Sequence, residues 1–362
     1  KNCRFLIHPK YNIISNRNLE IPLKKSCFYI TFYIGGGGNL RIIYNLLKKL
    51  LIENKNKKIK FLVILGPFSR NKSIILNLEK KYQNIKCIQN LENIVAIIKK
   101  TKIFVGTSGT SIFETAACNK PSILFKLSEN QNTDIFSLEN IGHYFFLDKK
   151  HLNSFNKLSK FLLILQKQYN RVKKIFKKPK IQIDFLGSER LVSQILENKI
   201  NIKKEQNIKN ASTPNNSKLP NNSKLIVRAV NDKDINHYLY CRNLKINLNN
   251  STNTKKINEL DHYLWWYTNK NRKSYILFRG TKKILYFYQE KLFKYEGKEY
   301  LLSGWFGCSK DCTIKEILHA LNWQKNQTKK NQKWLSLIKK TNRFSIALSK
   351  YIGWFKIQNN DK

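Results

Sequence analysis

Two glycine-containing turns follow apolar, strand-like segments in the first half of the sequence. The first is the run Gly35–Gly38, which comes directly before a helix-like stretch. The second lies in "GTSGTSIFE", Gly106–Glu114, where hydroxyls and backbone N–H groups again precede a helix-like stretch. N–H groups at a helix start attract anions, and glycine allows a phosphate to approach closely. Both turns therefore predict phosphate binding, although neither matches GxGxxG or the P-loop pattern, and a flexible turn is the alternative.

A carboxylate and an amide-rich loop complete this group of polar residues. Glu114 lies one turn into the helix after the second glycine turn, where it could accept hydrogen bonds from ribose hydroxyls. Its alternative role is a capping carboxylate in the first helical turn. The loop "SENQ", Ser128–Gln131, follows the next strand and could bind sugar hydroxyls or be an ordinary polar loop. Three polar turns at successive strand ends indicate one ligand better than any single turn does.

The elements that position these turns alternate along residues 26–198. The expected strands are 27–34, 59–66, 85–90, 102–109 and 121–127, and the expected helices are 40–54, 73–83, 91–101 and 111–119. Near-continuous apolar strands that alternate with helices are typical of a parallel sheet covered on both faces. Ligands bind such sheets at the carboxyl ends of the strands, where the polar turns lie. We therefore expect a Rossmann-like α/β domain over residues 1–198.

The second half of the chain has a different pattern. Residues 199–224 are mostly polar and contain "PNNSKL" twice in tandem, which predicts a flexible linker. Residues 225–362 then favour a β-meander flanked by helices, and thus an α+β domain. Its expected strands are 225–230, 274–280, 283–290, 299–307, 334–340 and 354–358, and its expected helices are 232–246, 257–268, 313–324 and 343–353.

Composition limits the function classes. The chain has 362 residues and a formal net charge of +45, but only 11 of its 68 basic residues are arginine, and the lysines are spread throughout. Phosphate and base recognition usually concentrates arginine on one face, so we expect a solvated lysine surface and no nucleic-acid partner, with nucleic-acid binding as the alternative. No apolar run approaches the roughly 18 residues of a membrane span. With seven cysteines and no signal peptide, we expect a reduced, cytoplasmic protein.

Three motifs together resemble one enzyme family. They are "ITFYIGGGGN", the long run from "NLENIVAIIKK" through "GTSGTSIFETAACNKPSILFKLSENQ", and "DFLGSERLVSQIL". This combination is similar to the UDP-2,4-diacetamido-2,4,6-trideoxy-β-L-altropyranose hydrolases of pseudaminic acid biosynthesis. The resemblance covers residues 1–198 and implies the carboxyl-terminal half of a GT-B fold. It also implies a UDP-sugar substrate that releases UDP, without a cofactor.

The resemblance implies roles at matching positions of this chain. Gly36 and Gly37 would approach the diphosphate, and the backbone near Ile94 would face uracil. Ser108, Gly109 and Thr110 would hold phosphate. Glu114 would contact the ribose, and Asn130 and Gln131 would contact the sugar. The water-activating histidine of the family belongs to the amino-terminal GT-B half, which has no match here. Because the sequence contains no methionine and starts at lysine, we expect a fragment whose catalytic residue lies outside it.

Residues 225–357 resemble the GNAT acetyltransferase superfamily, most clearly in the closing segment "SLIKKTNRFSIALSKYIGWFKI". This implies acetyl-CoA as a possible cofactor and a UDP-4-amino sugar as acceptor. However, Cys312 and Ile314 stand where the superfamily has pyrophosphate-binding glycines, and Ser349 stands at a position that often holds a tyrosine acid. An acetyltransferase and a catalytically degraded binding or scaffold protein therefore remain alternatives. The oligomeric state stays open.

One cysteine pair has the spacing of metal ligands. Cys308 and Cys312 are four residues apart, but no second Cys or His pair with zinc-like spacing follows them. We therefore expect ordinary thiols and no metal site.

Overall fold

The computed structural model describes residues 8–15, 23, 27–54, 59–131, 133–196, 224–295, 297–328, 332–354 and 356. The chain forms two compact units. The first unit comprises residues 1–213 together with 259–267, and the second comprises residues 214–258 and 268–362. Apart from Lys224, the expected linker 199–224 lies outside the described residues.

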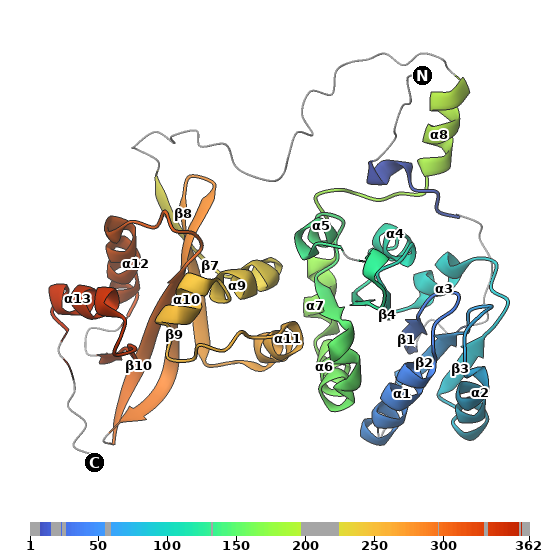
Figure 1. The fold of residues 1–362 in the computed structure, drawn as a ribbon, viewed down its shortest axis with the longest axis horizontal. Helices are drawn as coiled ribbons and strands as arrows, with labels where there is room; N and C mark the ends of the chain where they lie inside the picture. The colour runs from blue at the N-terminus through green and yellow to red at the C-terminus, as the bar shows by residue number, and fades with distance from the viewer. Residues whose placement is uncertain are drawn as a thin grey trace. The chain divides into compact units, whose positions relative to one another are not determined.

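The first unit is built on a six-stranded parallel sheet (Figure 1). Its strand order is β3-β2-β1-β4-β5-β6, which is the doubly wound Rossmann order. The expected α/β class is thus confirmed. The strands are β1 (Phe28–Tyr33), β2 (Ile59–Ile64), β3 (Ile85–Ile88), β4 (Ile103–Thr107), β5 (Ser122–Lys126) and β6 (Phe145–Asp148). In this order β1 and β4 are neighbours although they are distant in sequence. Strands β2 and β3 lie on one side of β1, and strands β4 to β6 lie on the other, so the strand order reverses between β1 and β4.

The first four helices of the first unit lie where the apolar periodicity predicts them, whereas the helices after residue 126, like strand β6, were not predicted. In α1 (Arg41–Glu53), Ile43, Leu46, Leu47 and Leu50 form one buried stripe at helical spacing. The other helices are α2 (Lys72–Lys81), α3 (Ile94–Lys100), α4 (Ser111–Ala117), α5 (Ile135–Asn140), α6 (Phe155–Lys167), α7 (Tyr169–Ile175) and α8 (Gly187–Leu196). Single-turn 3-10 helices are η1 (Pro9–Tyr11), η2 (Glu129–Gln131) and η3 (Lys149–Asn153). Helix α1 lies against α6, and α3 lies against α4.

One helix of the first unit comes from the later part of the sequence. Residues 259–267 of α11 (Glu259–Thr268) pack against β6 and α6. The ring of Tyr263 stacks on Phe161 with centroids 5.7 Å apart and meets Phe145 edge-on at 5.4 Å. Glu259 accepts a 2.9 Å bond from His151 Nε2. Residues far apart in the chain therefore complete the core at the β6 edge of the sheet, which no local sequence pattern indicates.

The second unit contains a five-stranded sheet of order β11-β10-β9-β8-β7. The strands are β7 (Leu225–Ala229), β8 (Arg272–Arg279), β9 (Lys282–Tyr295), β10 (Lys298–Gly307) and β11 (Trp334–Leu335). The first four form the expected antiparallel meander, and β11 pairs parallel to β10. This confirms the α+β class. Strand β11 is much shorter than the expected 334–340, and most of the expected strand 354–358 lies outside the described residues.

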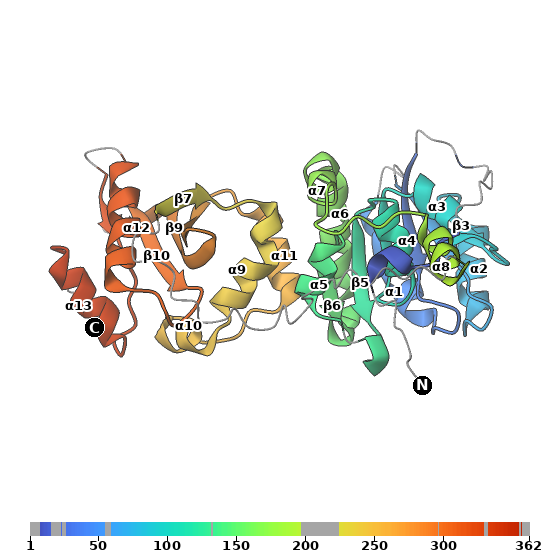
Figure 2. The same ribbon diagram turned by 90° about the horizontal axis from the view of Figure 1, so that it is seen from above.

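Helices cover both faces of this second sheet. In Figure 2, α12 (Ile314–Asn326) and α13 (Arg343–Tyr351) lie on one side, and α9 (Ile235–Arg242) and α10 (Lys245–Asn250) lie on the other. The expected helix 232–246 is thus divided into a 3-10 turn, η4 (Asp232–Asp234), and the two helices α9 and α10. The expected helix 343–353 is confirmed as α13, which Asn342 caps by accepting a 3.0 Å bond from Ser345 N–H.

No helix within the described residues is both long enough and apolar enough to cross a bilayer.

Candidate functional site

The two glycine turns meet at the carboxyl ends of β1 and β4. These strands pair directly, with Tyr33 opposite Gly106, so the residues after them share one edge of the sheet. The buried residue Thr107 lies between the turns. A methyl group placed on Gly35 or on Gly109 would be 3.9 Å or 3.8 Å from Thr107 Oγ1. The crevice between such neighbouring strands, where the strand order reverses, is the usual ligand position of a doubly wound sheet.

The four glycines of the first turn differ in what the fold requires of them. Gly35 has φ +85°, a left-handed conformation that favours glycine, and a side chain on Gly38 would collide with Ile34. Gly36 and Gly37 are different, because a Cβ on either would meet its nearest neighbour at 3.9 Å, an ordinary contact. Nothing in the fold thus demands glycine at these two positions, although the turn presents them at the sheet edge.

A third glycine supports the first turn from behind. Gly66 follows β2, and a Cβ placed on it would collide with the carbonyl oxygen of Gly35 and come within 2.7 Å of Gly36 Cα. Phe68 N–H donates a 2.8 Å bond to Gly36 O, and Arg70 N–H donates a 3.0 Å bond to Gly38 O. The loop after β2 therefore holds the glycine turn in place. From the sequence we assign no role in the site to Gly66 or Thr107. Gly66 is only the last residue of the expected strand 59–66.

The second turn divides its polar groups between the fold and the solvent. Ser108 is buried, its N–H donates a 3.0 Å bond to Phe125 O, and its hydroxyl donates a 3.1 Å bond to Gln131 O. Thr110 is exposed and precedes α4, and its side chain makes no capping hydrogen bond. The first N–H groups of a helix have no partner within it. In α4 the N–H groups of Ile112 and Phe113 donate to Gly109 O at 3.2 Å and Thr110 O at 3.0 Å. Within the described residues the N–H groups of Gly109 and Thr110 make no hydrogen bond, so these two can donate to an anion, whereas the Ser108 hydroxyl joins two loops.

The loop after β5 lies beside this turn through the Ser108–Gln131 bond. Gln131 Oε1 accepts a 3.0 Å bond from Leu127 N–H, which closes the loop and leaves the amide NH₂ group to donate elsewhere. The side chain of Asn130 lies outside the described part of the structure. The polar turns after β1, β4 and β5 are therefore brought together on three adjacent strands.

Glu114 occupies an unusual environment on α4. Within the described residues its carboxylate makes no hydrogen bond or ion pair, and burial raises its pKa. The phenol of Tyr33, at the end of β1, is close enough that burial and the charge of Glu114 both raise the pKa of Tyr33. A half-buried carboxylate without a partner is costly in free energy. Its position beside the β1–β4 crevice suits a ligand that carries hydroxyl donors.

The residues expected to face uracil lie at the start of α3. Asn93 is buried and caps the helix, because its Oδ1 accepts a 2.9 Å bond from Val95 N–H. The side chain of Ile94 packs, with Tyr33, against two apolar core clusters. The side chain of Ile94 is therefore partly buried, in the same apolar surroundings as Tyr33.

The side chain of His143 is buried in the core of the first unit. Its Nε2 lies 2.8 Å from Ile112 O, and burial lowers its pKa to about 4. The nitrogen that faces a carbonyl must carry the proton, so the neutral ring anchors α4 from beneath. A buried ring of this kind cannot serve as a base for a ligand at the sheet edge.

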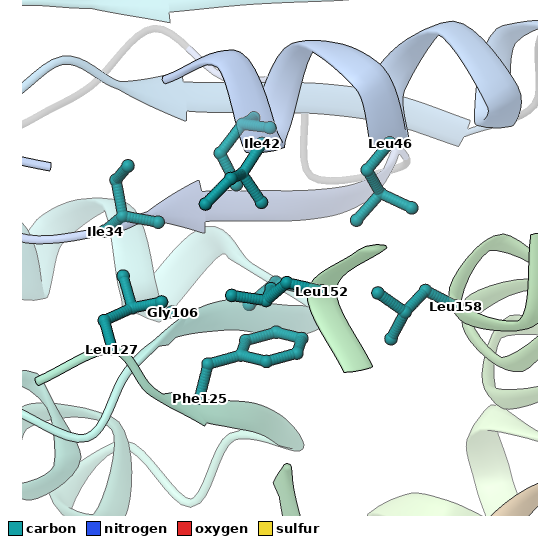
Figure 3. A pocket seen from close by; sticks show the side chains of 10 residues that line it. Ile34, Ile42, Leu46, Gly106, Phe125, Leu127, Leu152 and Leu158 are labelled. Atoms are coloured by element: carbon teal, nitrogen blue, oxygen red, sulfur yellow. The ribbon is translucent and has the colours of Figure 1, made fainter. Parts of the chain in front are cut away.

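A hollow beneath the glycine turn is too small for a substrate (Figure 3). Its volume is about 10 Å³, close to the space for one water molecule. Every side chain around it is apolar: Ile34, Ile42, Ile43, Leu46, Val105, Phe125, Leu127, Leu152 and Leu158, with Gly106 contributing backbone. The hollow is a packing gap between α1 and the sheet.

In the second unit, the turn before α12, where Cys312 and Ile314 replace the glycines of the resembled superfamily, is closed by side chains of the helix start. Thr313 and Glu316 form a reciprocal capping box at the start of α12: Thr313 N–H donates to Glu316 Oε2 at 2.8 Å, and Glu316 N–H donates to Thr313 Oγ1 at 3.4 Å. Arg279 Nε donates to Glu316 at 2.6 Å. Burial raises the pKa of Glu316, but the hydrogen bonds from Arg279 and Thr313 outweigh it and hold that pKa below its usual value. An anion would meet a fixed carboxylate here.

Comparison with protein families gives one match. Residues 30–183 match the glycosyltransferase family 28 C-terminal domain. The matched segment holds the six-stranded sheet except for the first two residues of β1, together with both glycine turns, and it is less than half of the chain. Together with the strand order, it supports the GT-B-like fold expected for the first unit. No curated protein matches the sequence.

Two kinds of solved structure are weakly similar to part of this chain. UDP-GlcNAc 2-epimerase from Neisseria meningitidis, bound to UDP-GlcNAc, is 16% identical with a TM-score of 0.34 over 48% of this chain and 45% of its own. An aminoglycoside N-acetyltransferase in complex with CoA is 14% identical with a TM-score of 0.29, over 39% of this chain and 94% of its own. A possible acetyltransferase from Clostridium difficile 630 is 14% identical with a TM-score of 0.31, over 38% and 95%. Likenesses this weak carry no statement about activity, and the chain spans less than half of the epimerase.

Proposed function

We propose that the first unit binds the UDP moiety of a UDP-sugar at the carboxyl ends of β1, β4 and β5. Gly36 and Gly37 would approach the diphosphate, and the N–H groups of Gly109 and Thr110 would donate to it. The Glu114 carboxylate would accept bonds from the ribose, and Gln131 would donate to the sugar. The unpartnered carboxylate of Glu114 is the observation that carries this proposal, because a ribose supplies the donors that the protein does not.

The finer proposal is a UDP-sugar hydrolase-like protein of nonulosonic (pseudaminic) acid biosynthesis. In that reaction water attacks the sugar carbon that bears the diphosphate, and the bond from this carbon to oxygen breaks to release UDP. The turn N–H groups and hydroxyls would stabilise the charge on the departing diphosphate. His143 cannot accept the proton of the attacking water because its ring is buried and bonded to Ile112. We assign binding and leaving-group stabilisation to this unit, and no base.

An acetyl-CoA-dependent activity of the second unit is supported less well. The capping box occupies the N–H groups of Thr313 and Glu316 at the start of α12 and fixes a carboxylate there. We therefore place nucleotide recognition in the first unit, and we treat the second as a GNAT-like domain without a built pyrophosphate site.

Calorimetry with UDP tests the ribose contact. Glu114→Gln should weaken UDP binding by about tenfold or more, since a charge-assisted hydrogen bond contributes about 1.5–3 kcal/mol. Glu53→Gln is the matched control, because Glu53 is exposed at the far end of α1 and the charge change is the same. Glu114→Gln should also unfold no more easily than the wild type at pH 7. The raised pKa of Glu114 means that its ionised form disfavours the folded state, and the variant removes that charge. Equal UDP affinity in Glu114→Gln and Glu53→Gln would remove the ribose contact from the account.

A further inference from the structure

A cluster of metal-ligating side chains lies in the second unit, whereas the proposed nucleotide site belongs to the first. His237 and Cys241 are on α9, and Cys308 follows the end of β10. One ligand atom from each residue lies within 4.8 Å of the other two. Positions 237 and 241 are one helical turn apart, so both side chains leave the same face of α9. From the sequence we consider only Cys308 with Cys312 and expect ordinary thiols there, because spacing rules do not detect residues that are far apart in the chain.

The distances within the cluster suit a tetrahedral ion. Cys241 Sγ is 3.6 Å from His237 Nδ1 and 3.9 Å from His237 Nε2. Bonds of about 2.3 Å to sulfur and about 2.0 Å to nitrogen would place two tetrahedral ligands about 3.6 Å apart. A ligand pair around zinc therefore needs only a few tenths of an ångström of adjustment here.

A surrounding set of hydrogen bonds holds the ligands in place. Tyr286 Oη is 2.8 Å from His237 Nδ1, which orients the ring and directs Nε2 toward an ion. The buried Asn247 side chain donates to Cys241 O at 2.6 Å and to Gly307 O at 2.8 Å. It thereby ties the helix that carries Cys241 to the strand end that carries Cys308. Such support around the ligands is typical of metal sites.

The charge balance favours a divalent cation. Two thiolates, a neutral imidazole and Zn²⁺ sum to zero, so a bound ion with its ligands would leave no net charge in this partly buried site. The nearby carboxylate of Asp234 is already paired with Arg228 at 2.7 Å and with Lys283 at 3.2 Å. Cys241 is buried, whereas His237 and Cys308 are partly exposed, so water can reach the remaining coordination position.

We propose that His237, Cys241 and Cys308 bind one Zn²⁺ ion, with water as the fourth ligand. This inference is independent of the nucleotide site proposed for the first unit.

Cobalt substitution of the full chain tests the zinc site. Chelator-treated, reduced protein titrated with Co²⁺ should gain a thiolate-to-cobalt charge-transfer absorption and the intense d–d bands of a four-coordinate site, saturating at one equivalent. Zn²⁺ should then remove both signals. Cys308→Ser and Cys241→Ser should each weaken Co²⁺ binding by more than tenfold. Cys312→Ser is the matched control, because it removes a partly exposed thiol four residues from Cys308, and it should leave the titration unchanged.

A milder variant protects the test against misfolding. Tyr286→Phe keeps the aromatic ring and should weaken Co²⁺ binding about 10–100-fold while preserving the shape of the spectrum. The proposal is overturned if the reduced wild type shows no charge-transfer band, or if the band survives both Cys241→Ser and Cys308→Ser. A Cys241–Cys308 disulfide found by mass spectrometry, in a protein that takes up no Co²⁺ after reduction, would also overturn it.

Discussion

The starts of α4 and α12 look alike in sequence and differ in structure. Each helix follows a strand and a short polar turn, and each has a threonine just before it and a glutamate in its first turn. In α12, Thr313 and Glu316 are three residues apart and cap each other. In α4, Thr110 and Glu114 are four residues apart, and no side-chain cap forms. The Thr–Glu spacing of three residues therefore gives α12 a side-chain cap, whereas the spacing of four leaves the start of α4 without one. We propose only the start of α4 as a ligand site.

This difference teaches where an anion site can persist. A capping box stabilises its helix but occupies the N–H groups that would bind phosphate. Helix α4 is held from elsewhere, since His143 Nε2 meets Ile112 O and Ser111 Oγ donates to Thr107 O at 3.3 Å. Its N-terminus can therefore remain open without loss of the helix.

Glycine substitutions around the first turn should give the largest contrast. Gly66→Ala should cost about 1–3 kcal/mol in the free energy of unfolding, because the new methyl group collides with the Gly35–Gly36 backbone. Gly36→Ala should leave stability within about 0.5 kcal/mol of the wild type, yet weaken UDP binding at least about tenfold. Urea unfolding with and without UDP, together with calorimetry, measures both effects. A Gly36→Ala protein that binds UDP normally would show that the turn does not contact diphosphate.

Removal of the two glutamates should sharpen the comparison of the helix starts. Glu316→Ala should destabilise the second unit by about 2 kcal/mol, since it removes both the capping box and the partner of Arg279. Glu114→Ala should cost far less, because its carboxylate supports no bond within the described residues. Thermal unfolding of both variants checks this. Equal losses would mean that Glu114 has a structural role like that of Glu316.

The buried ring behind α4 predicts a pH effect. The pKa of His143 is lowered to about 4 in the folded state from about 6.5 in the unfolded chain, so only the unfolded chain takes up this proton between these values. His143 therefore favours the folded state fully above pH 6.5, and this contribution falls by up to about 1.4 kcal/mol per pH unit as the pH drops toward 4. Urea unfolding at pH 7, 6 and 5 should show a smaller pH dependence in His143→Gln. An unchanged slope would contradict the burial of this ring.

The sequence predicts the framework of this chain better than its site. Apolar periodicity located β1–β5 and α1–α4, because each pattern is local to its own segment, but it did not identify β6 or the helices α5–α8. It also indicated that the polar turns Gly35–Gly38, Gly106–Glu114 and Ser128–Gln131 share one edge of the sheet, since parallel strands end together. It could not show that the Ser108 hydroxyl joins two loops, that Gly66 supports the glycine turn, or that Thr107 lies between the turns. Those facts depend on contacts between segments.

Long-range packing explains the other omissions. Residues 259–267 join the first unit through the ring of Tyr263, and the cluster of His237, Cys241 and Cys308 forms only when α9 meets the end of β10. Neither arrangement leaves a spacing signal along the chain. The closed start of α12 is the opposite case. The Thr-x-x-Glu pattern of residues 313–316 is a recognised capping signature, and it was available in the sequence.

The central claim is that the first unit, and not the second, recognises a nucleotide. Titration of the full chain with UDP and with acetyl-CoA in parallel calorimetry experiments tests it most directly. The account predicts saturable one-to-one binding of UDP and no saturable heat from acetyl-CoA. Saturable binding of acetyl-CoA by a folded sample that ignores UDP would contradict it.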